Sequence, residues 1–353
     1  MKIGLLGFSL SGRSTLFDAL SHGHAREGIA TVPLPDPRLE QLARLEHAKK
    51  VVPAALEWHD DLPDVLPNQP AMVRAALNHA RTMELLVCVL RWFDSPYAPY
   101  HAPIDPARDL RFWLDEFILS DLQIIENRLE RLMRLFQSHK ESAGDRAEAQ
   151  VLQELHGRLQ RGESLRDLHV APEIEARLRG FGLLTRKPLV VVANLAESLL
   201  GSEVEQPEWE PLSALCQQRG VPLIALSASF ERDLQQLPPE ERVPFLQMVG
   251  LTEPRLNTLI QAVYEQLQVQ RFYTLVGGDV RAWLLRRGGT ALEAAATIHT
   301  DMAKGFIRAE VCPADAVIAC GGWQAAHRAG KVQVVGRDHP LHEGDVVQIR
   351  FNV

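Results

Sequence analysis

The sequence predicts an α/β protein with a doubly wound, mostly parallel sheet, an inserted helical hairpin and a small β-rich module at the C-terminal end. Three observations indicate this class. Short apolar runs alternate with helical patterns over most of the chain, a long middle segment carries almost no strand signal, and glycine-rich turns separate short strands after about residue 272. The first pattern is typical of a parallel sheet with crossover helices.

The apolar runs account for the sheet strand by strand. They lie at residues 2–6, 85–90, 189–193 and 221–226, and each has the length and apolar character of a buried strand. The first run continues through a Gly/Ser loop into a helical segment that begins after Gly12. A strand, such a loop and a helix, in this order, begin an α/β domain.

Residues 110 to about 179 predict two antiparallel helices inserted between strands of the sheet. Apolar residues recur there at helical spacing at Leu122, Ile125, Leu129, Leu132 and Phe136, and again at Val151, Leu152, Leu155 and Leu159. We expect the break between the two helices at Gly144. A solvated projecting arm and a partner-binding arm are both open interpretations, because charge-laced amphipathic helices are common.

The C-terminal module is predicted to hold four strands and one helix. The strands lie at 272–276, 280–284, 332–335 and 346–351, and the helix lies at about 291–299. This pattern indicates a small module that resembles the β-grasp fold.

The composition excludes several classes of protein. A chain of 353 residues, 46% hydrophobic and 24% charged, is an ordinary globular protein with room for two or three domains. The four cysteines show no spacing that favours a zinc site or a disulfide framework. No segment approaches the roughly 18 apolar residues of a membrane span, and the N-terminus does not look like a signal peptide. We therefore expect a cytoplasmic protein without a membrane partner.

The formal net charge of −7 is unevenly distributed along the chain. Residues 271–353 hold 10 lysines and arginines and 8 acidic residues, so this module carries +2 and the rest carries −9. The acidic part is not expected to bind nucleic acid. The cations that could form a basic surface on the module are Arg281, Arg286, Arg287, Lys304, Arg308, Lys331 and Arg337.

The motif that carries most chemistry is Gly7-x4-Gly12-Arg13-Ser14, which has the spacing of a P-loop between a strand and a helix. Its backbone N–H groups would surround phosphate oxygens, and the Ser14 hydroxyl would bind Mg²⁺. Arg13 stands where P-loops carry lysine, and a planar guanidinium does not replace a compact ammonium in a tight phosphate site. The phosphate-binding candidates are Gly7, Ser9, Leu10, Ser11, Gly12, Arg13, Ser14 and Thr15. A plain strand-to-helix turn is the alternative.

Two more loops follow predicted strands in the order expected of a GTPase. Asn194, Leu195 and Glu197 follow the third run, where GTPases carry NKxD to read the base. Ser227, Ala228 and Ser229 follow the fourth, where a loop of small residues lies beside the base. Each loop alone could be a simple turn or helix cap. Together with the first motif, they favour a nucleotide-binding site.

The sequence resembles the YchF/Obg-like ATPase family of P-loop proteins over essentially the whole chain. The residues that carry the resemblance lie at 32–39, 49–53, 298–301, 304–310 and 344–353. The resemblance implies a G domain in two parts, 1–109 and 183–270, with a helical coiled-coil insertion at 110–182. It also implies a C-terminal TGS domain of β-grasp fold at 271–353.

The resemblance also implies ligands and partners. Family members carry NxxE in place of NKxD, and Asn194 and Glu197 keep this pattern. A family site of this kind is not strictly guanine-selective, so it would take ATP or GTP with Mg²⁺, and the metal would be held by Ser14 and Asp60. A ribosome or RNA partner, reached through the TGS domain and the helical arm, is implied in the same way.

The chain departs from the family at the residues nearest the phosphates. The long switch I loop with its metal-binding threonine is missing from residues 22–31, and switch II reads Asp60-Asp61-Leu62-Pro63 where the family has DxxG. Pro63 therefore replaces a glycine whose N–H donates to the γ-phosphate, and proline has no N–H. Asp60 is either a metal ligand or a cap of the following turn, and we expect the neighbouring His59 to be structural.

These departures predict a divergent family member that binds a purine nucleotide and hydrolyses it weakly or not at all. Each lost donor of this kind costs about 2.7 to 4 kcal/mol of barrier, and we assign no catalytic residue. Its expected partner is the ribosome, RNA or another component of translation. A scaffold that binds no nucleotide and an active ATPase or GTPase with an unusual switch remain alternative interpretations.

Overall fold

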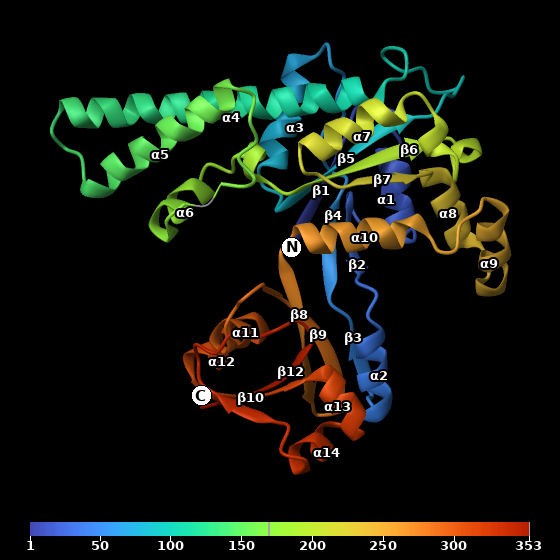
Figure 1. The fold of residues 1–353 in the computed structure, drawn as a ribbon, viewed down its shortest axis with the longest axis vertical. Coiled ribbons are helices and arrows are strands. Elements are labelled where there is room, and N and C mark those ends of the chain that lie inside the picture. The colour runs from blue at the N-terminus through green and yellow to red at the C-terminus, as the bar shows by residue number, and fades with distance from the viewer. Residues whose placement is uncertain (169, 353) are drawn as a thin grey trace. The chain divides into compact units, whose positions relative to one another are not determined.

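The structure, a computed structural model, describes residues 1–168 and 170–352 (Figure 1). The chain divides into two compact units, and each is made from two separate stretches of sequence. Unit 1 comprises Met1–Thr31 and Glu57–Gln266, and unit 2 comprises Val32–Leu56 and Leu267–Val353.

Unit 1 is built on a sheet with the strand order β2-β4-β1-β5-β6-β7. The strands are β1 (Lys2–Leu6), β2 (Ile29–Pro33), β4 (Ala55–His59), β5 (Leu85–Trp92), β6 (Leu189–Leu195) and β7 (Leu223–Leu226). The ladder from β4 through β1, β5 and β6 to β7 is parallel. The four predicted runs correspond to β1, β5, β6 and β7, which confirms the doubly wound sheet; no strand was predicted at β2 or β4.

Helices cover both faces of this sheet. The helices of unit 1 outside the inserted segment are α1 (Arg13–Ser21), α3 (Pro70–Ala80), α7 (Trp209–Gln218), α8 (Ala228–Gln236), α9 (Pro239–Met248), which packs on α8, and α10 (Arg255–Gln266). Short 3-10 turns are η1 (Leu184–Arg186), η2 (Glu197–Leu199) and η3 (Glu203–Glu205). Buried residues of α3, α7 and the start of α4 form one core with the strands. On the other side, α10 packs against β6 and β7 (Figure 1).

The inserted segment forms a long arm in which α4 (Pro106–Gln137) and α5 (Ala143–Gln160) lie side by side, followed by α6 (Pro172–Arg179) (Figure 1). Its core is a set of buried leucines and isoleucines at the predicted helical spacing. The prediction that Gly144 breaks the helices is wrong, because Gly144 lies in the first turn of α5. The break ends at Ser142, whose hydroxyl forms a capping box with Asp145.

Asp121 attaches the arm to the sheet. This residue of α4 is completely buried, and its carboxylate accepts hydrogen bonds from the Leu184 and Thr185 N–H groups, the Thr185 hydroxyl and Arg81 at 2.7–3.1 Å. A buried carboxylate is stable only with such a set of donors. The arm is therefore joined to the loop that leads into β6.

Unit 2 has a second sheet, in the order β11-β10-β12-β8-β9-β3. Its elements are α2 (Pro37–Leu45), β3 (Lys50–Val52), β8 (Val269–Val276), β9 (Asp279–Arg286), α11 (Ala291–Ile298), α12 (Thr300–Lys304), β10 (Phe306–Pro313), α13 (Ala314–Cys320), α14 (Trp323–Arg328), β11 (Gln333–Val335) and β12 (Asp345–Phe351). The hairpin β8–β9 is antiparallel, and the last strand β12 pairs in parallel with β8. A hairpin, a helix and a parallel central pair form the predicted β-grasp fold; β10 was not predicted.

Residues 32–56 pack in unit 2, although the sequence predicts them within the first part of the G domain. β3 extends the second sheet by pairing with β9. The Tyr273 hydroxyl lies 3.0 Å from both carboxylate oxygens of Asp36, and Arg38 binds the Asp315 carboxylate through two nitrogens. The predicted division into four parts remains a prediction.

Among the described residues, no helix has both the length and the hydrophobicity that crossing a bilayer requires.

Candidate functional site

The predicted phosphate loop follows β1, which lies between β4 and β5 in the sheet. In an open parallel sheet, ligands bind where connections diverge from a central strand in this way. Leu10 and Gly12 have positive φ angles of 65° and 87°, and α1 begins at Arg13. The N–H groups of the first turn of α1 have no acceptor within the helix, so this end of α1 is suited to an anion.

Asn194, at the end of β6, holds the predicted loops together. Its side-chain amide donates to the Ser11 carbonyl at 2.9 Å, and its carbonyl oxygen accepts from the Ala228 N–H at 2.9 Å. The side chain is 3% exposed. A Cβ atom on Gly12 would lie 2.0 Å from this amide, so glycine is required there for space as well as for its φ angle.

A pocket of about 370 Å³ opens beside these loops. Its volume lies in the usual range for small-molecule sites. Predicted site residues from three separate segments line it: Gly12, Thr15, Asn194, Leu195, Glu197, Ala228 and Ser229. The structure therefore brings together the beginning of α1 and the loops that follow β6 and β7.

The remaining predicted residues lie outside the lining. Gly7, Ser9, Leu10, Ser11, Arg13, Ser14 and Ser227 are not among the residues that line this pocket. Ser9 donates through its N–H and hydroxyl to the Val65 carbonyl, and Ser227 caps α8. The hydroxyl of Ser229 donates to the exposed Glu197 carboxylate at 2.9 Å. Glu197 thus faces the pocket with one oxygen already engaged.

Sequence reasoning missed the loop after β5. Phe93, Asp94 and Ser95 line the pocket, together with Ala196 and Arg232. This loop carries no recognisable motif. The signal that was available is topological, because β5 lies between β1 and β6 and its carboxyl end must meet the same edge of the sheet.

Arg91, which the sequence reasoning also missed, holds the phosphate loop through a backbone carbonyl. It is completely buried near the end of β5 and donates to the Leu10 carbonyl at 3.1 Å and to the Phe93 carbonyl at 2.9 Å. Its guanidinium lies 4.4 Å from the centre of the Phe93 ring and 5.0 Å from that of Tyr100. Burial lowers the pKa of Arg91, while the two rings and carbonyls solvate its charge.

Arg13 does not extend into the pocket, because the loop after β4 holds its guanidinium. Its Nε lies 2.5 Å from Asp60 Oδ1, and Nη2 donates to the Leu62 carbonyl at 3.0 Å and to Asp64 at 3.2 Å. A weaker contact of 3.4 Å reaches the Pro63 carbonyl. The Arg13 and Asp60 side chains are both 9% exposed, so Arg13 is neither solvated nor free to meet a phosphate.

The two predicted magnesium ligands fit the ion unequally. Ser14 is exposed in the first turn of α1, and its hydroxyl suits Mg²⁺. The Asp60 carboxylate is neutralised by the Arg13 guanidinium, so in this arrangement it does not fit the role of metal ligand. The predicted pair would meet a metal only after the Arg13–Asp60 ion pair had opened.

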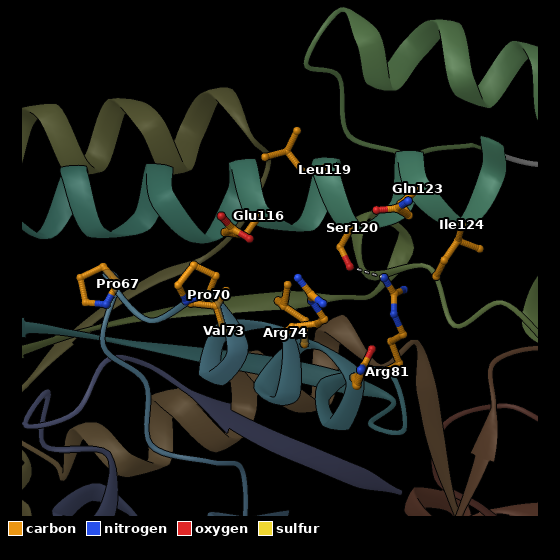
Figure 2. Close-up of a pocket in the computed structure, with 12 residues that line it drawn as sticks. Pro67, Pro70, Val73, Arg74, Arg81, Glu116, Leu119, Ser120, Gln123 and Ile124 are labelled. Atoms are coloured by element: carbon orange, nitrogen blue, oxygen red, sulfur yellow. Dashed lines mark hydrogen bonds between the residues drawn. The ribbon is translucent and has the colours of Figure 1, made fainter. Parts of the chain in front are cut away.

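A second pocket, of about 330 Å³, lies between α3 and α4, as Figure 2 shows. Arg81 crosses one end of it and donates to the Ser120 hydroxyl at 2.7 Å. Leu119 and Glu116 line it from α4, and Pro67 and Pro70 line it from the opposite side (Figure 2). Because no predicted site residue lies here, the pocket beside α1 is the candidate nucleotide site.

The strand order, the glycine loop at the central strand and the β-grasp module define a protein of the P-loop GTPase class. Comparison with known proteins identifies the family within it. The chain is 33% identical over 365 residues to the ribosome-binding ATPase YchF of Haemophilus ducreyi, covering 100% of this chain and 99% of that protein. The protein of the same name from Bacillus subtilis is 30% identical, with complete coverage of both chains. This chain belongs to the YchF family.

Two further comparisons agree with this assignment. Residues 269–352 match the family model YchF-GTPase_C, described as "Protein of unknown function (DUF933)". The structure of the Schizosaccharomyces pombe YchF GTPase superimposes with a TM-score of 0.87 at 24% identity, covering 99% of this chain and 97% of that one. A GTP-binding protein from Pyrococcus horikoshii has a TM-score of 0.63 at 18% identity, with 100% coverage of both chains. These structures confirm the fold.

The Arg13–Asp60 ion pair predicts a measurable coupling energy. We expect Arg13→Ala and Asp60→Ala each to destabilise the protein. The first leaves the Asp60 carboxylate buried without a cation, and the second leaves the Arg13 guanidinium with the exposed Asp64 as its only carboxylate partner among the described residues. The double variant should be more stable than the sum of the two losses predicts, by about 1 to 3 kcal/mol. Urea denaturation of the four proteins measures this coupling. Strictly additive effects would contradict the ion pair.

Glu231, on α8 beside the pocket, predicts a pH dependence of stability. Its carboxylate accepts the Arg255 N–H at 2.7 Å, and burial raises the pKa to about 7. In the unfolded chain the carboxyl group ionises near its ordinary pKa of 4.5. Raising the pH from about 4.5 to 7 therefore removes the proton from the unfolded state first, which lowers the free energy of unfolding.

We therefore expect Glu231→Gln to flatten this part of the stability profile. At pH 8 the variant should be more stable relative to the wild type than it is at pH 5, by about 2 kcal/mol. Urea denaturation at the two pH values checks the difference. Glu240→Gln, at an exposed position of α9, should leave the wild-type profile intact. If Glu231→Gln and Glu240→Gln lost the same amount of stability between pH 5 and pH 8, the pKa of Glu231 would not be raised.

Proposed function

We propose that this chain binds a purine nucleotide, ATP or GTP, in the pocket beside α1 and hydrolyses it weakly or not at all. One observation carries the proposal: residues predicted from three distant segments, at Gly12, Asn194 and Ala228, meet at one pocket. The beginning of α1 offers N–H groups to phosphates, and the loops after β6 and β7 offer polar groups to a base. The names of the relatives, which call them ATPases, support the same conclusion.

Weak hydrolysis follows from the charges near the phosphate loop. Phosphoryl transfer depends on cations and N–H groups directed at the γ-phosphate. In this chain the Arg13 guanidinium points at Asp60, and Pro63 offers no N–H. The cation expected at the phosphate and the anion expected at the metal neutralise one another.

The residues expected to contact the base do not select between adenine and guanine. Glu197 is exposed and accepts the Ser229 hydroxyl, while the amide of Asn194 is engaged on both sides by backbone groups. No buried carboxylate is fixed to read the guanine edge among these predicted residues. We therefore propose that ATP and GTP are both accepted.

A scaffold that binds no nucleotide is the second candidate. The Arg13–Asp60 pair favours it, because opening a pair with 9% exposure on each side opposes phosphate and metal binding. An active ATPase or GTPase is the third candidate and requires that the pair open during turnover.

Calorimetric titration of nucleotide-free protein with ATP, GTP and ADP, each with Mg²⁺, separates these candidates. We expect weak binding by the wild type and about tenfold tighter binding by Arg13→Lys, because a lysine releases Asp60 and suits a phosphate as a compact charge. Arg134→Lys, on the exposed face of α4, is the matched control and should bind as the wild type does. If neither the wild type nor Arg13→Lys releases heat with any nucleotide, the scaffold is favoured. A separate assay of phosphate release tests the active enzyme, which is favoured if the wild type turns over and Arg13→Ala does not.

We also propose that the chain binds ribosomes, in part through the cations of unit 2. The relatives are named ribosome-binding ATPases, and Arg286, Arg287, Lys304 and Arg308 are exposed. Each cation that contacts RNA releases counterions, so binding should weaken as salt rises. The helical arm is a second candidate contact.

Sedimentation with purified ribosomes at increasing salt tests this partner. The double variant Arg286→Ala/Arg287→Ala should sediment less and lose part of its salt dependence, because two phosphate contacts would be removed. Arg26→Ala/Arg74→Ala, at exposed positions of unit 1 outside the arm, is the charge-matched control. Equal sedimentation of both double variants would move the contact to the arm or elsewhere.

A further inference from the structure

Two histidines and an aspartate converge on one point at the carboxyl end of β4, outside both pockets. His59 is the last residue of β4, Asp61 lies two residues later, and His79 lies in the last turn of α3. Asp61 Oδ1 lies 3.3 Å from His59 Nδ1 and 3.3 Å from His79 Nε2. All three atoms lie within 4.8 Å of one another.

The two ring nitrogens of His59 face two different carboxylates. His59 Nε2 lies 2.7 Å from Glu57 Oε1, within hydrogen-bonding distance. The carboxylate is the acceptor of this contact and the ring nitrogen the donor, which places a proton on Nε2. If His59 is neutral, its Nδ1 therefore turns a lone pair toward Asp61.

That lone pair has no hydrogen-bond partner. His59 is 3% exposed, and Nδ1 is a buried polar atom without an acceptable hydrogen bond among the described residues. A lone pair and a carboxylate oxygen 3.3 Å apart repel each other unless a positive charge lies between them. The charge can be a second proton on His59 or a bound cation.

The geometry favours a metal ion. A tetrahedral ion bound at about 2.0 to 2.1 Å separates its ligand atoms by roughly 3.3 to 3.4 Å, and both separations from Asp61 are 3.3 Å. The two histidine nitrogens lie within 4.8 Å of one another. Direct charge-assisted hydrogen bonds would be shorter, at about 2.7 to 2.9 Å. Glu57 in turn orients His59 in the way that carboxylates orient zinc-bound histidines.

The surroundings also allow an ion to enter. The side chains of Asp61 and His79 are 28% and 30% exposed, whereas His59 closes the inner side. Two imidazoles and a carboxylate suit Zn²⁺ and related transition ions better than Mg²⁺, which prefers oxygen ligands. One coordination position would be left toward solvent.

We propose that His59, Asp61 and His79 form a binding site for a divalent transition-metal ion, with Zn²⁺ as the ion of best fit. The site joins α3 to the segment that continues into Asp60. None of its ligands lines the pocket beside α1, although His59 and Asp61 flank Asp60, the partner of Arg13. Glu57 is a positioning residue that acts through His59.

Titration of metal-free, full-length protein with Co²⁺ and Zn²⁺, without nucleotide or Mg²⁺, tests the site. We expect one Co²⁺ per chain with the intense visible absorption of a four-coordinate ion, and displacement of that ion by Zn²⁺. His79→Gln and Asp61→Asn, at partly exposed positions, should abolish this absorption. Glu57→Gln should weaken binding by about 10- to 100-fold.

His327→Gln, an exposed histidine of α14, is the matched control for the other histidines of the chain and should retain the full absorption. Retention of the absorption by both His79→Gln and Asp61→Asn would overturn the proposal. So would a nitrogen NMR spectrum in which both ring nitrogens of His59 keep their protons in the presence of Zn²⁺, because His59 would then be an imidazolium ion.

Discussion

The side chain of Asn194 is the interaction on which the candidate nucleotide site depends. Its amide joins the phosphate loop after β1 to the beginning of α8, and Gly12 leaves the space that it occupies. In a parallel sheet, the carboxyl ends of β1, β6 and β7 meet at one edge. A short side-chain amide, which donates one hydrogen bond and accepts another, fixes the loops that follow these strands against each other. An apolar residue at this position would leave a buried carbonyl and a buried N–H unpaired.

The charged residues of the site do not keep the arrangement that its loops keep. The loops keep the arrangement of a nucleotide-binding domain, whereas Arg13 and Asp60 satisfy each other. A guanidinium can bind a carboxylate and two backbone carbonyls at once, and an ammonium cannot hold this planar set. Replacement of the P-loop lysine by arginine therefore changes which groups the residue contacts, although its charge is unchanged.

The sequence was sufficient for the sheet of unit 1, the arm and the β-grasp fold, because buried strands and amphipathic helices have distinct apolar patterns. It was insufficient for Phe93, which lies in a loop without a motif, and for the Arg13–Asp60 pair, whose residues are far apart in the chain. The helix break was predicted at Gly144, but glycine is tolerated in the first turn of a helix. Ser142 and Asp145 have the spacing of a capping box, which is the signal that marks the beginning of α5. His79 carried no sequence signal toward His59, since only packing of α3 brings them together.

The pairing of β3 with β9 has a consequence for the order in which the chain is made. Lys50 is paired with Asp279, so residues 32–56 leave the ribosome long before the strand that completes their sheet has been synthesised. At about 5 to 20 residues per second, the delay is on the order of 10 to 50 seconds. During this interval β3 has no partner strand, so a nascent chain completes its first sheet before the sheet that β3 belongs to has been made.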